Sequence, residues 1–73
     1  MQSEDIERVR ERCESQWMNL EGVVGVGIGE SRQGKPIIIV YVEAMTEELR
    51  KAIPMRVDSF DVSIAETGEL EAL

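Results

Sequence analysis

The run of residues 22–29, Gly-Val-Val-Gly-Val-Gly-Ile-Gly, limits the fold of this chain more than any other segment. β-Branched residues dominate the run and alternate with glycine at a period of two, which indicates a β-strand. Because successive side chains of a strand point to opposite faces, Gly25, Gly27 and Gly29 share one face and leave its backbone bare. Such a face suits the close approach of a helix, another strand or a ligand.

A second strand follows the polar segment 31–35, which has the length and the glycine of a hairpin loop. Pro36 starts this strand, where its missing N–H does least damage. Residues 37–42, Ile-Ile-Ile-Val-Tyr-Val, are apolar on both faces, which indicates at least partial cover on each side. A two-stranded hairpin is too small a sheet to be stable alone, so we expect a third strand elsewhere in the chain.

Two helices are predicted, one before the hairpin and one after it in the sequence. Apolar residues recur at steps of three and four along the first, at Ile6, Val9, Cys13, Trp17 and Leu20. This spacing predicts an amphipathic helix over about 3–19, with Ser3 as its N-cap. A shorter helix is predicted over about 46–53, because Thr46 can cap its start and Pro54 stops it.

The third strand is predicted over about 59–66, where Phe60, Val62 and Ile64 alternate with Asp61, Ser63 and Ala65. The whole chain, 1–73, is then one α+β domain of order α-β-β-α-β, with a hairpin over about 22–43 and an acidic tail over 67–73. We expect a small three-stranded sheet with both helices on one face. The pattern leaves the strand order open, and if the third strand returns beside the first, that order is 2-1-3. The other face would expose apolar groups of the second strand, as interfaces do.

The charge balance disfavours two classes of partner. Fifteen acidic residues against 8 basic ones give a net charge of −7, which repels nucleic-acid phosphates and anionic lipid headgroups. The longest apolar stretch, 37–42, is also too short to span a bilayer. With a single cysteine and no apolar run before Gly22 that looks like an export signal, we expect a cytoplasmic location.

The sequence lacks the residue combinations that form catalytic or metal-binding sites. The chain has no histidine, which removes the commonest general base and the commonest nitrogen ligand for metals. Cys13 lies on the apolar stripe of the first helix, where cysteine acts as a small hydrophobic residue. The glycines lie inside a strand rather than at a strand-to-helix turn, so they do not form a phosphate-binding loop. We therefore predict no catalytic residue, no metal and no cofactor, and hence no enzyme.

Five short segments carry a resemblance to a known family: 22–29, 34–36, 39–42, 53–54 and 57–58. Together they resemble a small bacterial domain of unknown role that stands alone or precedes trypsin-like serine peptidase domains. The resemblance implies a companion or pro-region-like module. It carries over no catalytic residue, because the peptidase triad would lie in a separate domain, and this chain lacks the histidine that a triad needs.

Two functional hypotheses remain. The first is a non-enzymatic interaction or assembly module that binds a protein partner or a second copy of itself through a sheet edge or face. Its candidate interface consists of Gly25, Gly27, Gly29, Ile38, Val40 and Val42. The alternative is a domain that cradles a small anionic ligand on the glycine strand. Its candidate anchors are Arg32, Lys35 and Arg56.

Overall fold

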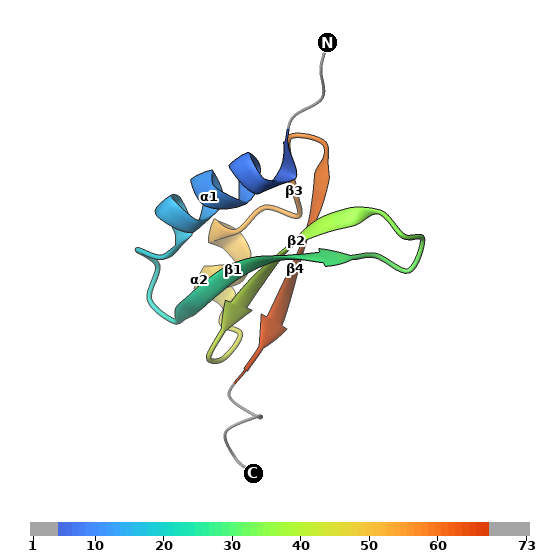
Figure 1. The fold of residues 1–73 in the computed structure, drawn as a ribbon. Coiled ribbons are helices and arrows are strands. Elements are labelled where there is room, and N and C mark those ends of the chain that lie inside the picture. The colour runs from blue at the N-terminus through green and yellow to red at the C-terminus, as the bar shows by residue number, and fades with distance from the viewer. Residues whose placement is uncertain (1–4, 68–73) are drawn as a thin grey trace.

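The computed structural model describes residues 5–67, and these form two helices and four strands (Figure 1). In chain order the elements are α1 (Ile6–Trp17), β1 (Val23–Glu30), β2 (Pro36–Val42), α2 (Glu47–Ala52), β3 (Arg56–Val57) and β4 (Phe60–Glu66). The α+β class is confirmed, and the sheet has one strand more than predicted. Apart from Thr67, the acidic tail lies outside the described residues.

The strand order is β1-β2-β4-β3. The strands β1 and β2 form the predicted antiparallel hairpin, β2 and β4 run parallel, and β3 pairs antiparallel with β4. The order 2-1-3 that the sequence left open does not occur, because β4 lies beside β2 and not beside β1. Parallel neighbours need a crossover, which α2 and its loops supply, and the free edge of β2 is the nearest place for β4 to return. The doubly apolar β2 is thus a central strand.

The missed strand, β3, has only two residues and therefore no periodicity to read in the sequence. Arg56 pairs with Asp61 and Val57 with Phe60, around a turn at Asp58 and Ser59. Asp58 has a φ of 55°, a left-handed conformation that aspartate tolerates better than most residues. Its carboxylate also accepts a hydrogen bond from Arg12 of α1 at 2.5 Å, which ties this turn to the helix.

Side chains cap both helices as they begin. Asp5 accepts a hydrogen bond from the Glu7 amide at 3.2 Å, so α1 starts two residues later than predicted, and Ser3 lies outside the described residues. Thr46 caps α2 as predicted, accepting from the Leu49 amide at 3.1 Å. Each capping oxygen satisfies an amide that has no partner inside the helix.

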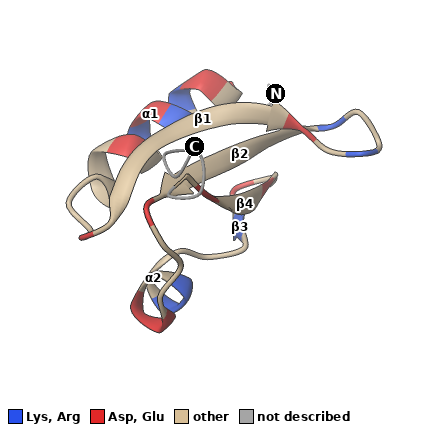
Figure 2. Ribbon diagram, turned by 90° about the horizontal axis from the view of Figure 1, so that it is seen from below, with Lys and Arg blue, Asp and Glu red and all other residues tan. Residues whose placement is uncertain are grey.

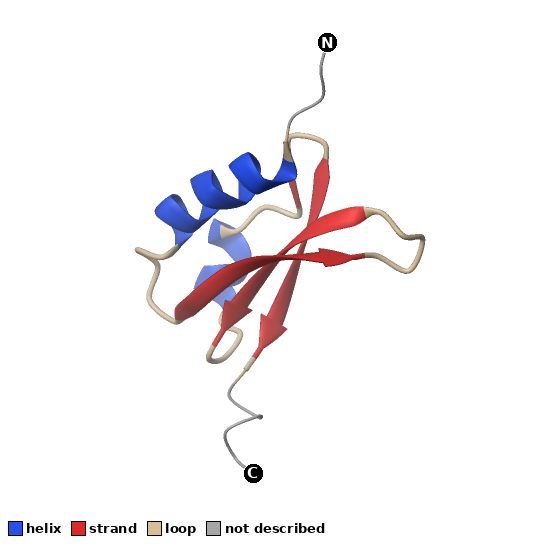
Figure 3. Ribbon diagram, viewed as in Figure 1, coloured by secondary structure: helices blue, strands red, loops and turns tan. Residues whose placement is uncertain are grey.

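Both helices lie on the same side of the sheet (Figure 3). One cluster of buried side chains joins them to the strands, which makes a two-layer fold. Its members are Val9, Cys13 and Trp17 of α1, Val23 and Val26 of β1, Ile38, Val40 and Val42 of β2, Leu49 of α2, and Ile53. We call the side of the sheet that meets this cluster the inner face.

Candidate functional site

The opposite side of the sheet has no helix over it among residues 5–67. We call it the outer face. The register of β1 with β2 pairs Gly25 with Tyr41, Gly27 with Ile39 and Gly29 with Ile37. The register of β2 with β4 adds Ser63 beside Ile39 and Ala65 beside Tyr41. The three glycines and the side chains of Ile37, Ile39, Tyr41 and Ala65 are half-buried, and Ser63 is exposed.

The glycine strip on the outer face is covered by side chains of the neighbouring strand. A Cβ on Gly27 would lie 3.2 Å from Cε2 of Tyr41, and one on Gly29 would lie 2.2 Å from Cδ1 of Ile39. The side chains of Ile39 and Tyr41 therefore lean diagonally across β1 and rest on its bare backbone. Aromatic and β-branched residues often cover a strand glycine from the next strand in this way. The result is a flat, apolar surface.

Charged side chains are scarce on β1 and β2. Figure 2 shows acidic and basic residues gathered on the helices and loops, whereas β1 is coloured only at its Glu30 end. From Pro36 to Val42 no residue carries a charge. An apolar patch with a charged surround is typical of a protein-interaction surface.

The structure divides the six residues of the predicted interface between the two faces. Gly25, Gly27 and Gly29 lie on the outer face, as the interface requires. By contrast, Ile38, Val40 and Val42 are each 0% exposed and form the centre of the core. This corrects the prediction for β2. The residues of β2 that share a face with the glycines are its odd-numbered ones.

The sequence held a signal for those residues. A five-residue loop, 31–35, joins the two strands and pairs Glu30 with Pro36. From Gly25 to Glu30 the residue numbers of each pair add up to 66, so odd-numbered residues of β1 face the same way as odd-numbered residues of β2. The register shifts only before Gly25, where Val23 pairs with Val42. The apolar character of β2 on both sides concealed which set was buried, because Ile37 and Ile38 are the same residue type.

The outer edge of β1 is open among the described residues, since β1 ends the strand order. The Ser31 amide donates to the Lys35 carbonyl at 2.8 Å, which makes this a hydrogen-bonded pair. By the alternation of antiparallel ladders, the amides of the three outer-face glycines then point to β2. The amides of Val26 and Ile28 point to the open edge, where another strand can pair with them.

The three candidate anchors for an anionic ligand do not surround the glycine strip. Arg32 and Lys35 are exposed in the hairpin loop. Arg56 lies on β3, at the other end of the strand order, and its Nε is 3.4 Å from Oδ1 of Asp61. With Tyr41 and Ile39 resting on the glycines, this arrangement offers a flat apolar surface rather than a cradle of cations.

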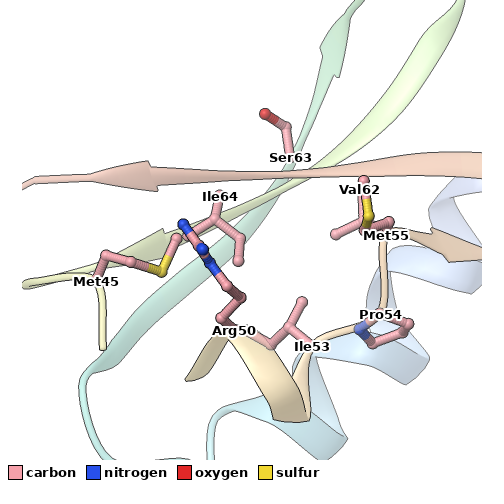
Figure 4. Close-up of a pocket in the computed structure, with 8 residues that line it drawn as sticks. All are labelled: Met45, Arg50, Ile53, Pro54, Met55, Val62, Ser63 and Ile64. Carbon is pink, nitrogen blue, oxygen red and sulfur yellow. The ribbon is translucent and has the colours of Figure 1, made fainter. Parts of the chain in front are cut away.

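A groove of about 460 Å³ lies between α2 and β4, on the side of the sheet that faces the helices (Figure 4). Sequence reasoning missed it, because nothing in a sequence shows how closely a short helix packs on its sheet. Met45, Arg50, Ile53, Pro54, Met55, Val62, Ser63 and Ile64 line it. Met55 is 84% exposed, which is unusual for a large apolar side chain.

The described residues contain no cluster of three or more His, Cys, Asp or Glu side chains that could hold a metal ion. Cys13 is 2% exposed in the core, and burial raises the pKa of its thiol. The nearby Arg12 lowers that pKa and Asp58 raises it, both to a lesser degree. A buried thiol with a raised pKa is a poor nucleophile, so Cys13 has a packing role here.

Comparison with protein-family models, with curated proteins and with solved structures finds no match. The resemblance to a peptidase-associated bacterial domain therefore stays a prediction. Within residues 5–67, neither helix is long and apolar enough to cross a membrane.

Proposed function

We propose that this domain is a non-enzymatic assembly module that pairs with a second copy of itself through the outer face. The observation that carries the proposal is the row of half-buried apolar side chains, Ile37, Ile39 and Tyr41, on a sheet face that no helix within residues 5–67 covers. In two-layer folds, an apolar sheet face is ordinarily buried against another layer. A second sheet can supply that layer, since sheets pack face to face about 10 Å apart.

The chemistry of the face supports a second copy as the partner. Each chain carries a net charge of −7, so two copies repel one another unless their charges stay at the rim of the contact. The uncharged segments Val23–Gly29 and Pro36–Val42 meet this condition. A domain of 73 residues also has a small core, and pairing stabilises such domains by burying further apolar area.

Sedimentation velocity over a range of concentrations tests the proposal. We expect the mass to rise with concentration from 8.2 kDa toward twice that value. Ile39→Arg places a charge in the middle of the outer face and should hold the protein at the monomer mass. The matched control is Met18→Arg at the C-cap of α1, where the methionine is 44% exposed and belongs to the helix layer on the inner side of the sheet. This control should associate as the unaltered protein does.

Two results would count against the proposal. One is a strictly monomeric protein at every concentration. The other is equal loss of association in Ile39→Arg and Met18→Arg, which would show that added charge alone prevents pairing. Circular dichroism of both variants checks that each is folded.

A further inference from the structure

The groove between α2 and β4 has apolar walls from two elements. In Figure 4, the side chains of Ile64 and Ile53 point toward each other from the strand and from the end of the helix. Met45 and Met55 stand at the two ends, and methionine side chains adapt readily to different apolar guests. The volume of about 460 Å³ is enough for several side chains of a bound segment.

The groove reaches the open backbone edge of β4. Ser63 lines it, yet Figure 4 shows the Ser63 hydroxyl pointing away from Arg50 and the groove, so its backbone forms the wall. The Val62 amide donates to the Met55 carbonyl at 2.8 Å, on the β3 side of β4. The Thr67 amide instead donates to Val42 of β2 at 2.7 Å.

These two bonds fix which amides of β4 point outward. Successive residues of a strand direct their amides to opposite edges, so even-numbered residues of β4 face the β3 side and odd-numbered residues face β2. β3 pairs with β4 only through Arg56 and Val57. The backbone groups of Ile64 and Glu66 therefore lie beyond the reach of β3, on an edge that is open among the described residues.

Arg50 is an exposed residue of α2 that lines this apolar groove and brings a positive charge to its wall. It extends from α2 toward Ile64 and Met45 (Figure 4). Among residues 5–67 the ion pairs join Arg10 to Glu14, Arg12 to Asp58 and Arg56 to Asp61, so no carboxylate of these residues pairs with Arg50. A guanidinium beside apolar walls recognises a carboxylate on an otherwise apolar guest.

We propose that this groove binds an extended peptide segment of another protein, which adds a strand to the open edge of β4. Its backbone pairs with Ile64 and Glu66, in line with β3. Its alternate side chains enter the groove, two apolar ones flanking one acidic one that meets Arg50. Strand addition of this kind takes affinity from main-chain hydrogen bonds and specificity from the pockets for alternate side chains. The site lies across the sheet from the outer face and does not depend on the assembly proposed above.

The probe is an acetylated, amidated, fluorescently labelled peptide, Thr-Leu-Thr-Glu-Thr-Leu-Thr, whose Leu, Glu and Leu fall on one side of a strand. Fluorescence anisotropy against the full chain should show saturable binding. Arg50→Met, and separately a probe with Gln in place of Glu, should each weaken binding about two- to fivefold, the range for a partly exposed ion pair. The two changes together should weaken it no further than either alone. Lys51→Met, which removes the neighbouring charge on α2 without touching the groove, is the matched control and should leave the affinity unchanged.

Backbone methylation tests strand addition itself. Two further probes carry N-methyl groups on one or the other set of alternate residues. Since only one set of amides can face β4, one probe should lose binding at least tenfold and the other should keep it. Equal binding of both probes would overturn strand addition in favour of simple side-chain capture. If Arg50→Met left the affinity unchanged, or if no saturable binding were seen, the proposal of a peptide-binding site in this groove would be refuted. None of these outcomes depends on whether the protein self-associates.

Discussion

The ring of Tyr41 lies against the backbone of Gly27 on the neighbouring strand, so close that a Cβ there would be 3.2 Å from Cε2. This contact explains why a strand with three glycines on one face is stable. Glycine costs conformational entropy in a strand, and it has no side chain to pack. Tyr41 and Ile39 supply the missing apolar cover from β2, and the same leaning side chains give the outer face its smooth surface.

Two of the outer-face glycines, Gly25 and Gly29, should respond differently to a methyl group. At Gly25 a Cβ would meet Tyr41 only at 4.0 Å, an ordinary contact. Gly25→Ala should therefore stabilise the fold by about 0.4–1 kcal/mol, because it reduces the freedom of the unfolded chain. At Gly29 the Cβ would lie 2.2 Å from Ile39 Cδ1, so Gly29→Ala must displace that side chain and should destabilise the fold by about 1 kcal/mol. Urea unfolding of the two variants measures the difference, and equal effects would contradict the contact.

The turn between α1 and β1 depends on glycine at position 22. Gly22 has a φ of +97°, and a Cβ there would lie 3.4 Å from Leu49 Cδ1. Gly22→Ala should cost about 1–3 kcal/mol of unfolding free energy, because side chains rarely adopt this backbone conformation. The comparison is Gly34→Ala in the hairpin loop, where φ is +82° and a Cβ would meet nothing within 4 Å. A larger loss at position 22 than at 34 in thermal unfolding would reveal the added crowding against Leu49.

The ion pair between Arg12 and Asp58 should contribute little free energy despite its short distance of 2.5 Å. The two side chains are 55% and 37% exposed, so water screens them. In a double-mutant cycle of Arg12→Met and Asp58→Asn, we expect a coupling of about 0.2–1 kcal/mol that falls with added salt. Asparagine keeps the tolerance for the positive φ of position 58, so the cycle reports the charge pair alone. A coupling above about 2 kcal/mol would show that the pair is shielded from solvent.

The stability of the fold should fall at high pH because of Cys13. Burial raises the pKa of this thiol above its ordinary value of 9.0. Below pH 9 the thiol is protonated in both states, and its contribution to stability is fully present. As the pH rises from 9 through the raised pKa of the folded state, the unfolded chain releases the thiol proton first. The free energy of unfolding therefore falls, by no more than about 1.4 kcal/mol per pH unit.

Urea unfolding at pH 7 and pH 10 measures this effect when Cys13→Ala serves as the reference. Other groups titrate equally in both proteins, so their effects cancel in the difference. The unaltered protein should lose more stability than the variant over this interval. The same loss in both would show that the thiol is no harder to ionise in the folded state.

Local pattern was enough to predict most of the elements. The period of two in residues 22–29 predicted β1, and the steps of three and four from Ile6 to Leu20 predicted α1. The two-residue strand β3 was not predicted, since its pairing depends on the turn at Asp58. Of the candidate interface, the glycines lie on the outer face and their role there stays a prediction, whereas Ile38, Val40 and Val42 are core residues. Counting residues across the hairpin loop would have paired the glycines with Ile37, Ile39 and Tyr41.

By itself, the sequence determined the class of the fold, the hairpin and the two helices, because these depend on interactions between residues a few positions apart. Only the tertiary structure decided that β4 lies beside β2, that α2 leaves a groove over β4, and that Tyr41 covers Gly27. Those features come from segments distant in the chain, and β2 is apolar on both sides, so its pattern is equally compatible with either face being buried. The packing of α1 and α2 against one face removed that ambiguity, and neither helix covers the other face.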